Sequence, residues 1–271
     1  MAEPPHACDP DPGLGPPTLA RVYDYMLGGA HNFAVDRAVT GRIERLVPGT
    51  IRTAWENRAF LRRAVQYCAG QGIDQFLDIG SGIPTMGNVH EVARAVLPEA
   101  RIIYVDVDPV AVSQSEAILA GVPGCAVVNA DLRDPESILG HRHTRELLDF
   151  DRPIAVLLVA LLHVIPDRDR PAELIGRLTS TAVPGSHLVI SHFSSNYGTE
   201  AQIRKVIEWS ARTTTPLVAR EPAQILALLG DFRPVPPGLV PVHEWRPDTE
   251  PAAGTAQSGG YGVVARLLSE V

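Results

Sequence analysis

The sequence predicts a doubly wound α/β fold with a mostly parallel sheet, preceded by a helical extension. Beyond residue 73, short apolar segments rich in Val, Ile and Leu alternate with segments of helical periodicity. This alternation is typical of parallel strands that are joined by crossover helices and covered on both faces. Before residue 73 the periodicity is helical only, so we expect helices and no strand there.

Three helices are expected ahead of the first strand, and a flexible arm ahead of them. Residues 1–17 contain six prolines and little apolar surface to bury. Thr18 has a side chain that caps helix N-termini, and helical periodicity follows at residues 19–27, 35–46 and 51–69. We therefore divide the remaining chain into a helical extension at 18–72 and an α/β domain with carboxyl-terminal cap elements at 73–271.

Within the α/β domain, strands are predicted at residues 75–79, 101–107, 126–130, 154–159 and 187–191. Connecting helices are predicted at residues 88–96, 110–119 and 171–182. Asp108 and Pro109 supply an N-cap and a first-turn proline for the second of these helices. The last third is less regular, and there we expect helices at 199–212 and 221–229 and closing strands at 239–245 and 261–268.

Composition excludes several classes of protein. The formal net charge of −7 argues against a nucleic-acid backbone as the partner, since phosphate binding needs a basic surface. Lys205 is the one lysine of the chain and does not stand in a P-loop. The longest apolar run, residues 154–162, has less than half the length of a membrane helix. These features predict a cytoplasmic protein, as do three scattered cysteines, Cys8, Cys68 and Cys125.

An acid and two glycines end the first predicted strand, in the segment Asp78-Ile-Gly80-Ser81-Gly82. Glycine allows the backbone to turn sharply and lets a ligand approach it closely. By itself this pattern also fits an ordinary strand-to-helix turn. The acids that follow the next two strands favour a ligand site.

Asp106 and Asp108 end the second predicted strand, and Asp131 follows the third. Asp106 lies 24 residues beyond Gly82, close to the spacing of about 20 at which an acid accepts the ribose hydroxyls of an adenine nucleoside. Asp131 is placed to accept a hydrogen bond from the exocyclic amine of adenine. Asp108 is explained equally well as a helix cap. Ligands of open α/β sheets bind at the carboxyl ends of strands, where these acids gather.

The acids favour S-adenosylmethionine over a dinucleotide. A dinucleotide would place its pyrophosphate at the glycine turn, where Asp78 would repel it. Thr85 also stands where the dinucleotide pattern has a third Gly or Ala. S-adenosylmethionine carries no phosphate, and a carboxylate attracts its sulfonium and ammonium cations. We therefore expect this cofactor, with S-adenosylhomocysteine as its product.

The chain resembles the class I S-adenosylmethionine-dependent methyltransferases in its glycine motif Asp78-x-Gly80-x-Gly82, its ribose acid Asp106 and its adenine-side acid Asp131. More narrowly, it resembles a bacterial family of S-adenosyl methyltransferase-like proteins formerly catalogued as a domain of unknown function. The similarity covers nearly all of the chain after residue 17 and rests on segments 20–33, 56–62, 76–84, 104–109 and 237–248. The resemblance implies a Rossmann-like fold and methyl transfer.

His163 and Tyr25 are predicted to lie near the cofactor. His163 follows the fourth strand, where it would act as a catalytic base or pack on the cofactor. Tyr25 would stack in a lid over the cofactor, although a docking helix with a solvated polar face explains it equally well. Asn57 and Arg58 are placed to line the same cleft. The predicted cofactor-binding set is Tyr25, Asp78, Gly80, Ser81, Gly82, Asp106, Val107, Asp108, Asp131, Leu132 and His163.

We expect methyl transfer to an oxygen or nitrogen of a small-molecule acceptor. The alternative is a non-catalytic protein in which S-adenosylmethionine or S-adenosylhomocysteine switches a regulatory interaction, because no catalytic base is obvious. Asp78 and Thr85 disfavour an NAD-dependent oxidoreductase. No metal site is expected, since His141 and His143 stand in a polar loop without a carboxylate or cysteine companion. The sequence leaves the oligomeric state open.

Overall fold

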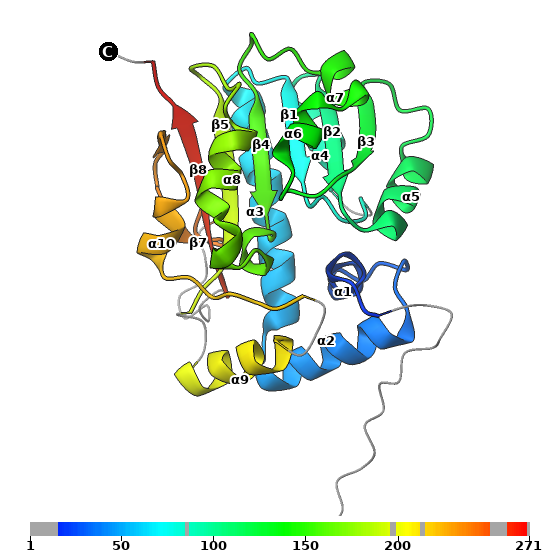
Figure 1. Ribbon diagram of the computed structural model, residues 1–271, viewed down its shortest axis with the longest axis vertical. Helices are drawn as coiled ribbons and strands as arrows, with labels where there is room; N and C mark the ends of the chain where they lie inside the picture. Colours follow the sequence, from blue (N-terminus) through cyan, green and yellow to red (C-terminus); the bar gives the residue numbers. More distant parts are fainter. Residues whose placement is uncertain (1–15, 85–86, 196–198, 212–214, 250–258, 270–271) are drawn as a thin grey trace, which may run out of the picture.

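The structure is a computed structural model that describes residues 16–84, 87–195, 199–211, 215–249 and 259–269. Thr85 and residues 1–15 of the predicted arm lie outside the described residues. In the part described, an eight-stranded sheet forms the centre and helices cover both of its faces (Figure 1). The predicted doubly wound, mostly parallel α/β fold with an N-terminal helical extension is confirmed.

The strands are β1 (Gln75–Ile79), β2 (Arg101–Asp106), β3 (Cys125–Asn129), β4 (Ala155–Val159), β5 (His187–Phe193), β6 (Phe232–Pro234), β7 (Val240–Pro241) and β8 (Gly260–Leu267). The α-helices are α1 (Leu19–Met26), α2 (Ala34–Leu46), α3 (Thr50–Gly70), α4 (Val89–Arg94), α5 (Pro109–Ile118), α6 (Pro135–Gly140), α7 (Arg142–Leu147), α8 (Pro171–Leu178), α9 (Glu200–Ser210) and α10 (Pro222–Ala227). Two 3₁₀ turns follow β4, η1 (Leu162–Val164) and η2 (Asp167–Asp169).

The strand order β3-β2-β1-β4-β5-β8-β6 contains a reversal that creates a binding crevice. From β1 the chain winds outward through β2 to β3 and then returns to β4 on the other side of β1, and all of these pairs are parallel. Strand β8 is antiparallel to β5 and β6, and β7 also pairs with it. In such sheets the ligand lies at the carboxyl ends of the strands where the order reverses.

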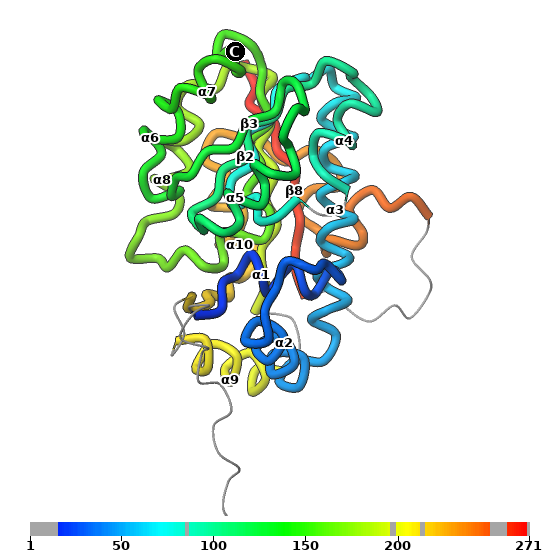
Figure 2. Tube along the Cα trace, turned by 90° about the vertical axis from the view of Figure 1, so that its right-hand side faces the viewer, coloured from blue at the N-terminus to red at the C-terminus, as the bar shows by residue number. Residues whose placement is uncertain are grey.

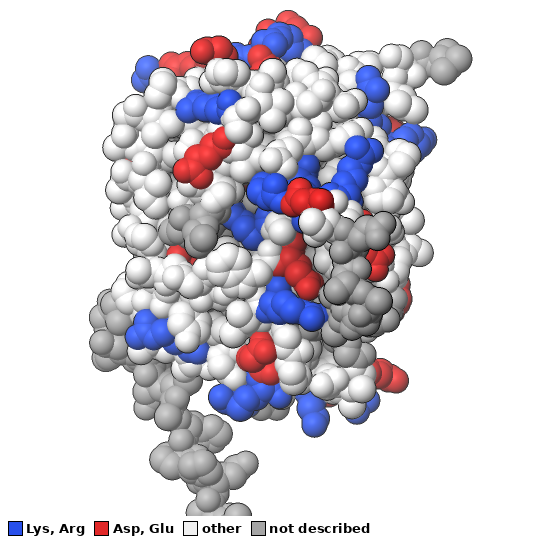
Figure 3. Space-filling model, turned by 180° about the vertical axis from the view of Figure 1, so that it is seen from behind, with Lys and Arg blue, Asp and Glu red and all other residues white. Residues whose placement is uncertain are grey.

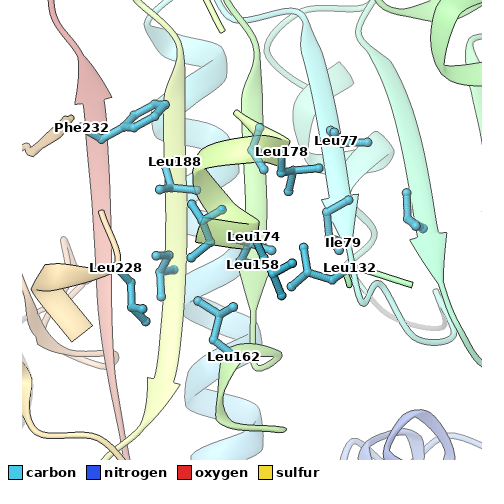
Figure 4. Packing of buried hydrophobic residues seen from close by; sticks show 14 of the residues in the cluster. Leu77, Ile79, Leu132, Leu158, Leu162, Leu174, Leu178, Leu188, Leu228 and Phe232 are labelled. Carbon is cyan, nitrogen blue, oxygen red and sulfur yellow. The ribbon is translucent and has the colours of Figure 1, made fainter. Parts of the chain in front are cut away.

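Two hydrophobic clusters, one on each face, hold the helices to the sheet. Because side chains alternate along a strand, Leu77 joins one cluster and its neighbour Phe76 joins the other. Figure 4 shows the first cluster, in which Leu174 and Leu178 of α8 pack against strand residues such as Leu158. Each fully buried leucine contributes about 1.5–3 kcal/mol relative to an exposed one.

Helices α1, α2 and α9 lie together at the carboxyl ends of the parallel strands (Figures 1 and 2). The Thr18 side chain accepts a hydrogen bond from the Arg21 amide and caps α1, as predicted. The buried Arg21 side chain binds Asp36 of α2, with Nε to Oδ2 at 2.9 Å. The helical extension therefore covers the edge of the sheet where the predicted site lies.

Two predictions about the later segments are wrong. Of the predicted strand 239–245, β7 includes only Val240 and Pro241, and the chain then turns so that Trp245 packs edge-on against Phe60 of α3. Trp245 is therefore buried by a helix rather than by strand pairing. His143 does not stand in a loop but in α7, whereas His141 lies at the bend between α6 and α7, where its side chain caps α7.

Acidic and basic side chains are interspersed on the face opposite that of Figure 1 (Figure 3). Among the described residues drawn there, neither sign of charge covers the surface continuously. No helix in the described ranges has the length and apolar character that crossing a bilayer requires.

Candidate active site

A cavity of about 450 Å³, which we call the strand-end cavity, lies at the carboxyl ends of β1 to β4. From the helical extension it is lined by residues of α1 and α3 and by the segment that precedes α1. It brings together nine of the eleven predicted cofactor-binding residues: Asp78, Gly80, Ser81, Gly82, Asp106, Val107, Asp108, Asp131 and Leu132.

The glycine turn depends on left-handed backbone conformations. Gly80 and Gly82 have φ of 68° and 63°, a region that favours glycine. The amides of Gly80 and Ser81 donate to the carbonyl of Val105, at 2.8 and 3.1 Å, and fix the turn to β2. A Cβ atom on Gly80 would lie 2.7 Å from Cδ1 of Leu161. The turn thus needs glycine at Gly80 for both its conformation and its space.

Asp106 joins the glycine turn to the end of β2. Its Oδ2 accepts from the Gly82 amide at 2.8 Å, and its Oδ1 accepts from the Asp108 amide at 2.9 Å. Burial raises the pKa of Asp106, while these amide hydrogen bonds oppose the rise. A carboxylate has about four acceptor positions, so Asp106 retains capacity for hydroxyl donors in the cavity.

Asp78 is a buried acid that faces a guanidinium across the cavity. It is 5% exposed, and burial raises its pKa to about 7, although the positive charge of Arg58 opposes the rise. Arg58 comes from α3 and lines the same cavity, as predicted from the sequence. A cation bound beside Asp78 would favour its ionised form.

Ser81 Oγ and Asp108 Oδ2 are buried atoms of the cavity lining for which the described residues provide no hydrogen-bond partner. The other oxygen of Asp108 accepts from the Val110 amide at 2.9 Å and caps α5, so the predicted capping role is also present. Buried polar atoms are normally paired. These two atoms lack that pairing.

Three further residues of the strand-end cavity follow strands: Val107 follows β2, and Asp131 and Leu132 follow β3. Asp131 pairs with Arg133, with Oδ2 to NH1 at 3.1 Å, and Arg133 also binds Asp169 at 2.7 Å. Leu132 is buried, whereas Val107 is 59% exposed. An exposed apolar side chain beside an acid suits one face and one edge of a planar base.

A second cavity of about 190 Å³, which we call the apolar cavity, adjoins the strand-end cavity. It lies among α1, α2, α3, α9 and the end of β5. His163 lines this cavity and not the strand-end cavity. Both cavities are lined by Pro17, Thr18, Leu19, Tyr23, Asn57, Ala160 and Thr215.

A chain of hydrogen bonds runs along the wall that the two cavities share. Nδ2 of the Asn57 side chain donates to Tyr23 Oη at 2.8 Å, and Ser191 Oγ donates to Asn57 Oδ1 at 2.5 Å. The Ala160 amide in turn donates to Ser191 Oγ at 2.9 Å. The sequence did not indicate Ser191 as a site residue, and within the predicted lid it favoured Tyr25 rather than Tyr23 as the cofactor contact. Helical periodicity was the available signal, because it places Tyr23 on the apolar face of α1 with Met26.

Tyr25 lies outside both cavities and is 37% exposed. The helix turns by about 100° per residue, so the α1 face that carries Tyr23 to the cavities directs Tyr25 away from them. Asp24, His31 and Asn32, which lie near Tyr25 in the sequence, bond to one another. Asp24 accepts from the His31 backbone amide at 2.8 Å and from Asn32 Nδ2 at 2.9 Å.

His163 is an uncharged imidazole in the apolar cavity. Burial lowers its pKa to about 3, with further contributions from His192 and Arg220. Its Nδ1 is buried and has no hydrogen-bond partner among the described residues. A base this weak is poorly matched to proton abstraction near pH 7. It is well suited to hold a hydrogen-bonding group.

A mostly parallel sheet with an acid–glycine turn and a strand-end cavity defines an α/β protein that binds a nucleoside cofactor. The chain belongs to the S-adenosyl methyltransferase family, whose model matches residues 13–268. It is an S-adenosylmethionine-dependent methyltransferase, and S-adenosylmethionine is its cofactor.

Solved structures agree with this assignment. A candidate methyltransferase from Thermobifida fusca YX is 39% identical, with a TM-score of 0.89 over 96% of this chain and 99% of that chain. A DUF574 family protein from Streptomyces avermitilis is 35% identical, with a TM-score of 0.88 over 93% and 98%. The N-methyltransferase NodS from Bradyrhizobium japonicum, in complex with S-adenosylhomocysteine, shares the fold at 14% identity and a TM-score of 0.53, over 92% and 100%. No curated protein matches the sequence.

Proposed function

We propose that the chain transfers a methyl group from S-adenosylmethionine in the strand-end cavity to an oxygen or nitrogen of a small molecule in the apolar cavity. The observation that carries this proposal is the wall that the two cavities share. Tyr23, Asn57 and Ala160 line both of them, so a donor in one and an acceptor in the other would meet there. Methyl transfer is an in-line displacement, for which such positioning supplies much of the catalysis.

The residues of the strand-end cavity match the groups of the cofactor. Asp106 would accept hydrogen bonds from the ribose hydroxyls. Asp131, with Val107 and Leu132, would hold the adenine. The glycine turn leaves room for the methionine part, since Gly80 and Gly82 have no side chains.

The two charged side chains at the turn would hold the ends of the methionine part. Asp78 would bind the ammonium, which offsets the burial of its carboxylate. Arg58 lines the same cavity and would bind the methionine carboxylate, since guanidinium groups recognise carboxylates. A dinucleotide would not fit this arrangement, because Asp78 would repel its pyrophosphate.

When bound, the cofactor supplies a methyl group activated by its positive sulfur. The chain itself contributes orientation and exclusion of water, because apolar side chains form most of the second cavity. We assign His163 to holding the acceptor by a hydrogen bond rather than to the catalytic base. The low pKa of His163 supports this assignment, and methyl transfer does not require a base within the protein.

Calorimetric titration with S-adenosylmethionine, S-adenosylhomocysteine and NAD tests the donor site. We expect the first two to bind, Asp106→Asn to weaken both by at least about tenfold, or ~1.4 kcal/mol, and NAD not to bind. Asp151→Ala is the matched control, because Asp151 is an exposed acid outside both cavities. Binding of NAD alone, or no binding at all, would contradict the proposed donor site.

Transfer of a labelled methyl group separates the enzyme from the regulatory alternative. The purified protein is incubated with labelled S-adenosylmethionine and fractions of small molecules from a cell extract. Repeated turnover on one fraction supports methyl transfer. Tight cofactor binding without turnover on any fraction would favour a protein whose interactions are switched by the cofactor.

A further inference from the structure

The apolar cavity is lined mainly by hydrocarbon side chains from three helices. Val22 and Met26 come from α1, Val39 and Ile43 from α2, and Val206 and Trp209 from α9. Among the described residues of its lining there is no Asp, Glu, Lys or Arg. A charged ligand would therefore find no opposite charge among them, and an unpaired buried charge costs several kcal/mol.

The two histidines of the lining do not supply a charge either. Burial lowers the pKa of His192 to about 4, as it lowers that of His163 to about 3. The hydrogen bonds of His192 fit a neutral ring, because Nε2 lies 2.8 Å from NH1 of Arg220 and Nδ1 lies 2.6 Å from the Phe193 carbonyl. Nε2 thus accepts and Nδ1 donates.

The guanidinium of Arg220 behind His192 is occupied by internal partners. NH1 also donates to the Leu162 carbonyl at 2.7 Å, and NH2 donates to Asp167 at 2.6 Å. Arg220 does not line the cavity, so its charge fixes the segment after β4 rather than meeting a ligand.

Among the described residues of the lining, the imidazole of His163 has a buried ring nitrogen, Nδ1, without a hydrogen-bond partner. The other site groups are paired with one another, since Tyr23 Oη donates to the Ala54 carbonyl at 3.1 Å and Asn57 bonds to both Tyr23 and Ser191. Of the buried side-chain N and O atoms in the described lining, Nδ1 of His163 has no partner. His163 is three residues beyond Ala160, which lines both cavities. The His163 ring is therefore close to the wall that separates the acceptor from the proposed donor.

The size of the cavity limits the acceptor. An apolar cavity of about 150 Å³ holds benzene, whereas drug-sized ligands occupy about 300–1,000 Å³. At about 190 Å³ the apolar cavity suits one substituted ring or a branched aliphatic group of similar size.

We propose that the methyl acceptor is an uncharged, mainly apolar molecule of about one substituted ring, with a hydroxyl group that donates a hydrogen bond to the imidazole of His163. This inference rests on the proposed function, since it names the acceptor for the same site. The hydroxyl oxygen bonds to the methyl carbon while the carbon–sulfur bond breaks and leaves its electron pair on the sulfur. The hydroxyl proton passes to water, and the cofactor leaves as the neutral thioether.

Binding of three probes of similar size tests the proposal, in protein saturated with S-adenosylhomocysteine at pH 7.5. The probes are p-cresol, 4-methylbenzoate and benzylamine, which are neutral, anionic and cationic. We expect p-cresol to bind with a Kd of about 1 mM or below, and both charged probes to bind at least about tenfold more weakly. Equal or tighter binding of either charged probe, or no binding of p-cresol at millimolar concentrations, overturns the proposal.

The role of His163 is tested by His163→Phe, which keeps a ring and removes the acceptor nitrogen. We expect a loss of about fivefold or more for p-cresol and no loss for toluene, which lacks the hydroxyl. Equal losses for both probes would overturn the assigned hydrogen bond. Ile43→Trp provides a second variant, because it should fill the cavity and abolish p-cresol binding, whereas Val96→Trp, at an exposed position outside both cavities, should not.

Binding of S-adenosylhomocysteine in the same titrations keeps the two proposals distinguishable. If it binds but p-cresol does not, the acceptor class is wrong and the donor site stands. If it does not bind, the proposed function itself is wrong.

Discussion

Asp78 combines burial with a proposed ligand role that requires charge. Burial raises its pKa to about 7, so the cofactor-free protein holds this carboxyl partly protonated near neutral pH. An ammonium group binds only the ionised form well. Binding below pH 7 must therefore release a proton from Asp78, at a cost of about 1.4 kcal/mol for each unit of pH.

We predict that affinity for S-adenosylmethionine rises with pH between about 5.5 and 7 and levels off above about 7. The sign follows from the raised pKa, since lower pH favours the protonated form that cannot accept the cation. Calorimetry across this range measures the slope. Asp78→Asn should bind more weakly and with a flatter profile, and the raised pKa of Asp106 would account for any slope that remains. Identical slopes in both proteins would contradict the role of Asp78.

Gly80→Ala should weaken cofactor binding by more than its backbone strain explains. A residue with φ near 68° costs about 1–2 kcal/mol when it carries a Cβ, and this Cβ would also push Leu161 into the strand-end cavity. Gly121→Ala is the matched control, because Gly121 has φ of 77° and open space around it. Chemical denaturation should show a loss of stability in both variants, larger in Gly80→Ala because of the contact with Leu161, and calorimetry should show lost affinity in Gly80→Ala alone. Unchanged affinity in Gly80→Ala would count against the turn as part of the site.

At the scale of elements, polar contacts with α2 and α3 hold the short helix α1 in place. Its eight residues are too few for an independent helix. Arg21 and Asp36 are both buried and paired, and Tyr23 bonds to α3 through Asn57 and the Ala54 carbonyl. Removing one partner of a buried ion pair leaves an uncompensated charge, which costs about 3–5 kcal/mol.

Arg21→Met should therefore loosen α1 while the sheet stays folded. We expect amide exchange in α1 to accelerate by about a hundredfold or more, exchange in β4 to change little, and cofactor affinity to fall. Arg142→Met, which breaks an exposed pair with Glu146, should change neither exchange nor affinity. Equal acceleration in α1 and β4 would mean that the pair stabilises the whole fold and not this helix.

The sequence predicts secondary structure correctly where a continuous apolar run marks a buried strand. It fails where packing between distant segments determines the conformation. The parallel strands have continuous apolar runs because helices cover both faces, so β1 to β5 were found. Segment 239–245 has a similar composition, yet Trp245 is buried by α3, which no local pattern reveals. For the same reason the sequence does not distinguish Tyr23 from Tyr25, since the face of α1 that meets the site depends on how the helix docks. The sequence places His163 near the reacting atoms. Only the folded structure shows that it lines the apolar cavity and not the strand-end cavity.

For the whole molecule, cofactor binding should appear as added stability. At a free concentration of a hundred times Kd, S-adenosylhomocysteine stabilises the folded state by ~2.7 kcal/mol. In a chain of this size that corresponds to a rise in Tm of about 5–10 °C. Scanning calorimetry measures the rise, and NAD at the same concentration is the control. A similar rise with NAD, or none with S-adenosylhomocysteine, would contradict the assigned cofactor site.

Tyr23 of α1 and Asn57 of α3 line both cavities, so the proposed donor and acceptor would contact the same wall. We expect the ligand that binds first to bear the entropy of restricting these side chains, so that the second binds a wall already in place. Cofactor and acceptor are therefore expected to bind with positive cooperativity, and thermodynamic linkage makes the factor the same in both directions. The departure of either product then lowers affinity for the other. The wall that assembles the reactants thus also favours emptying of the site after each turnover.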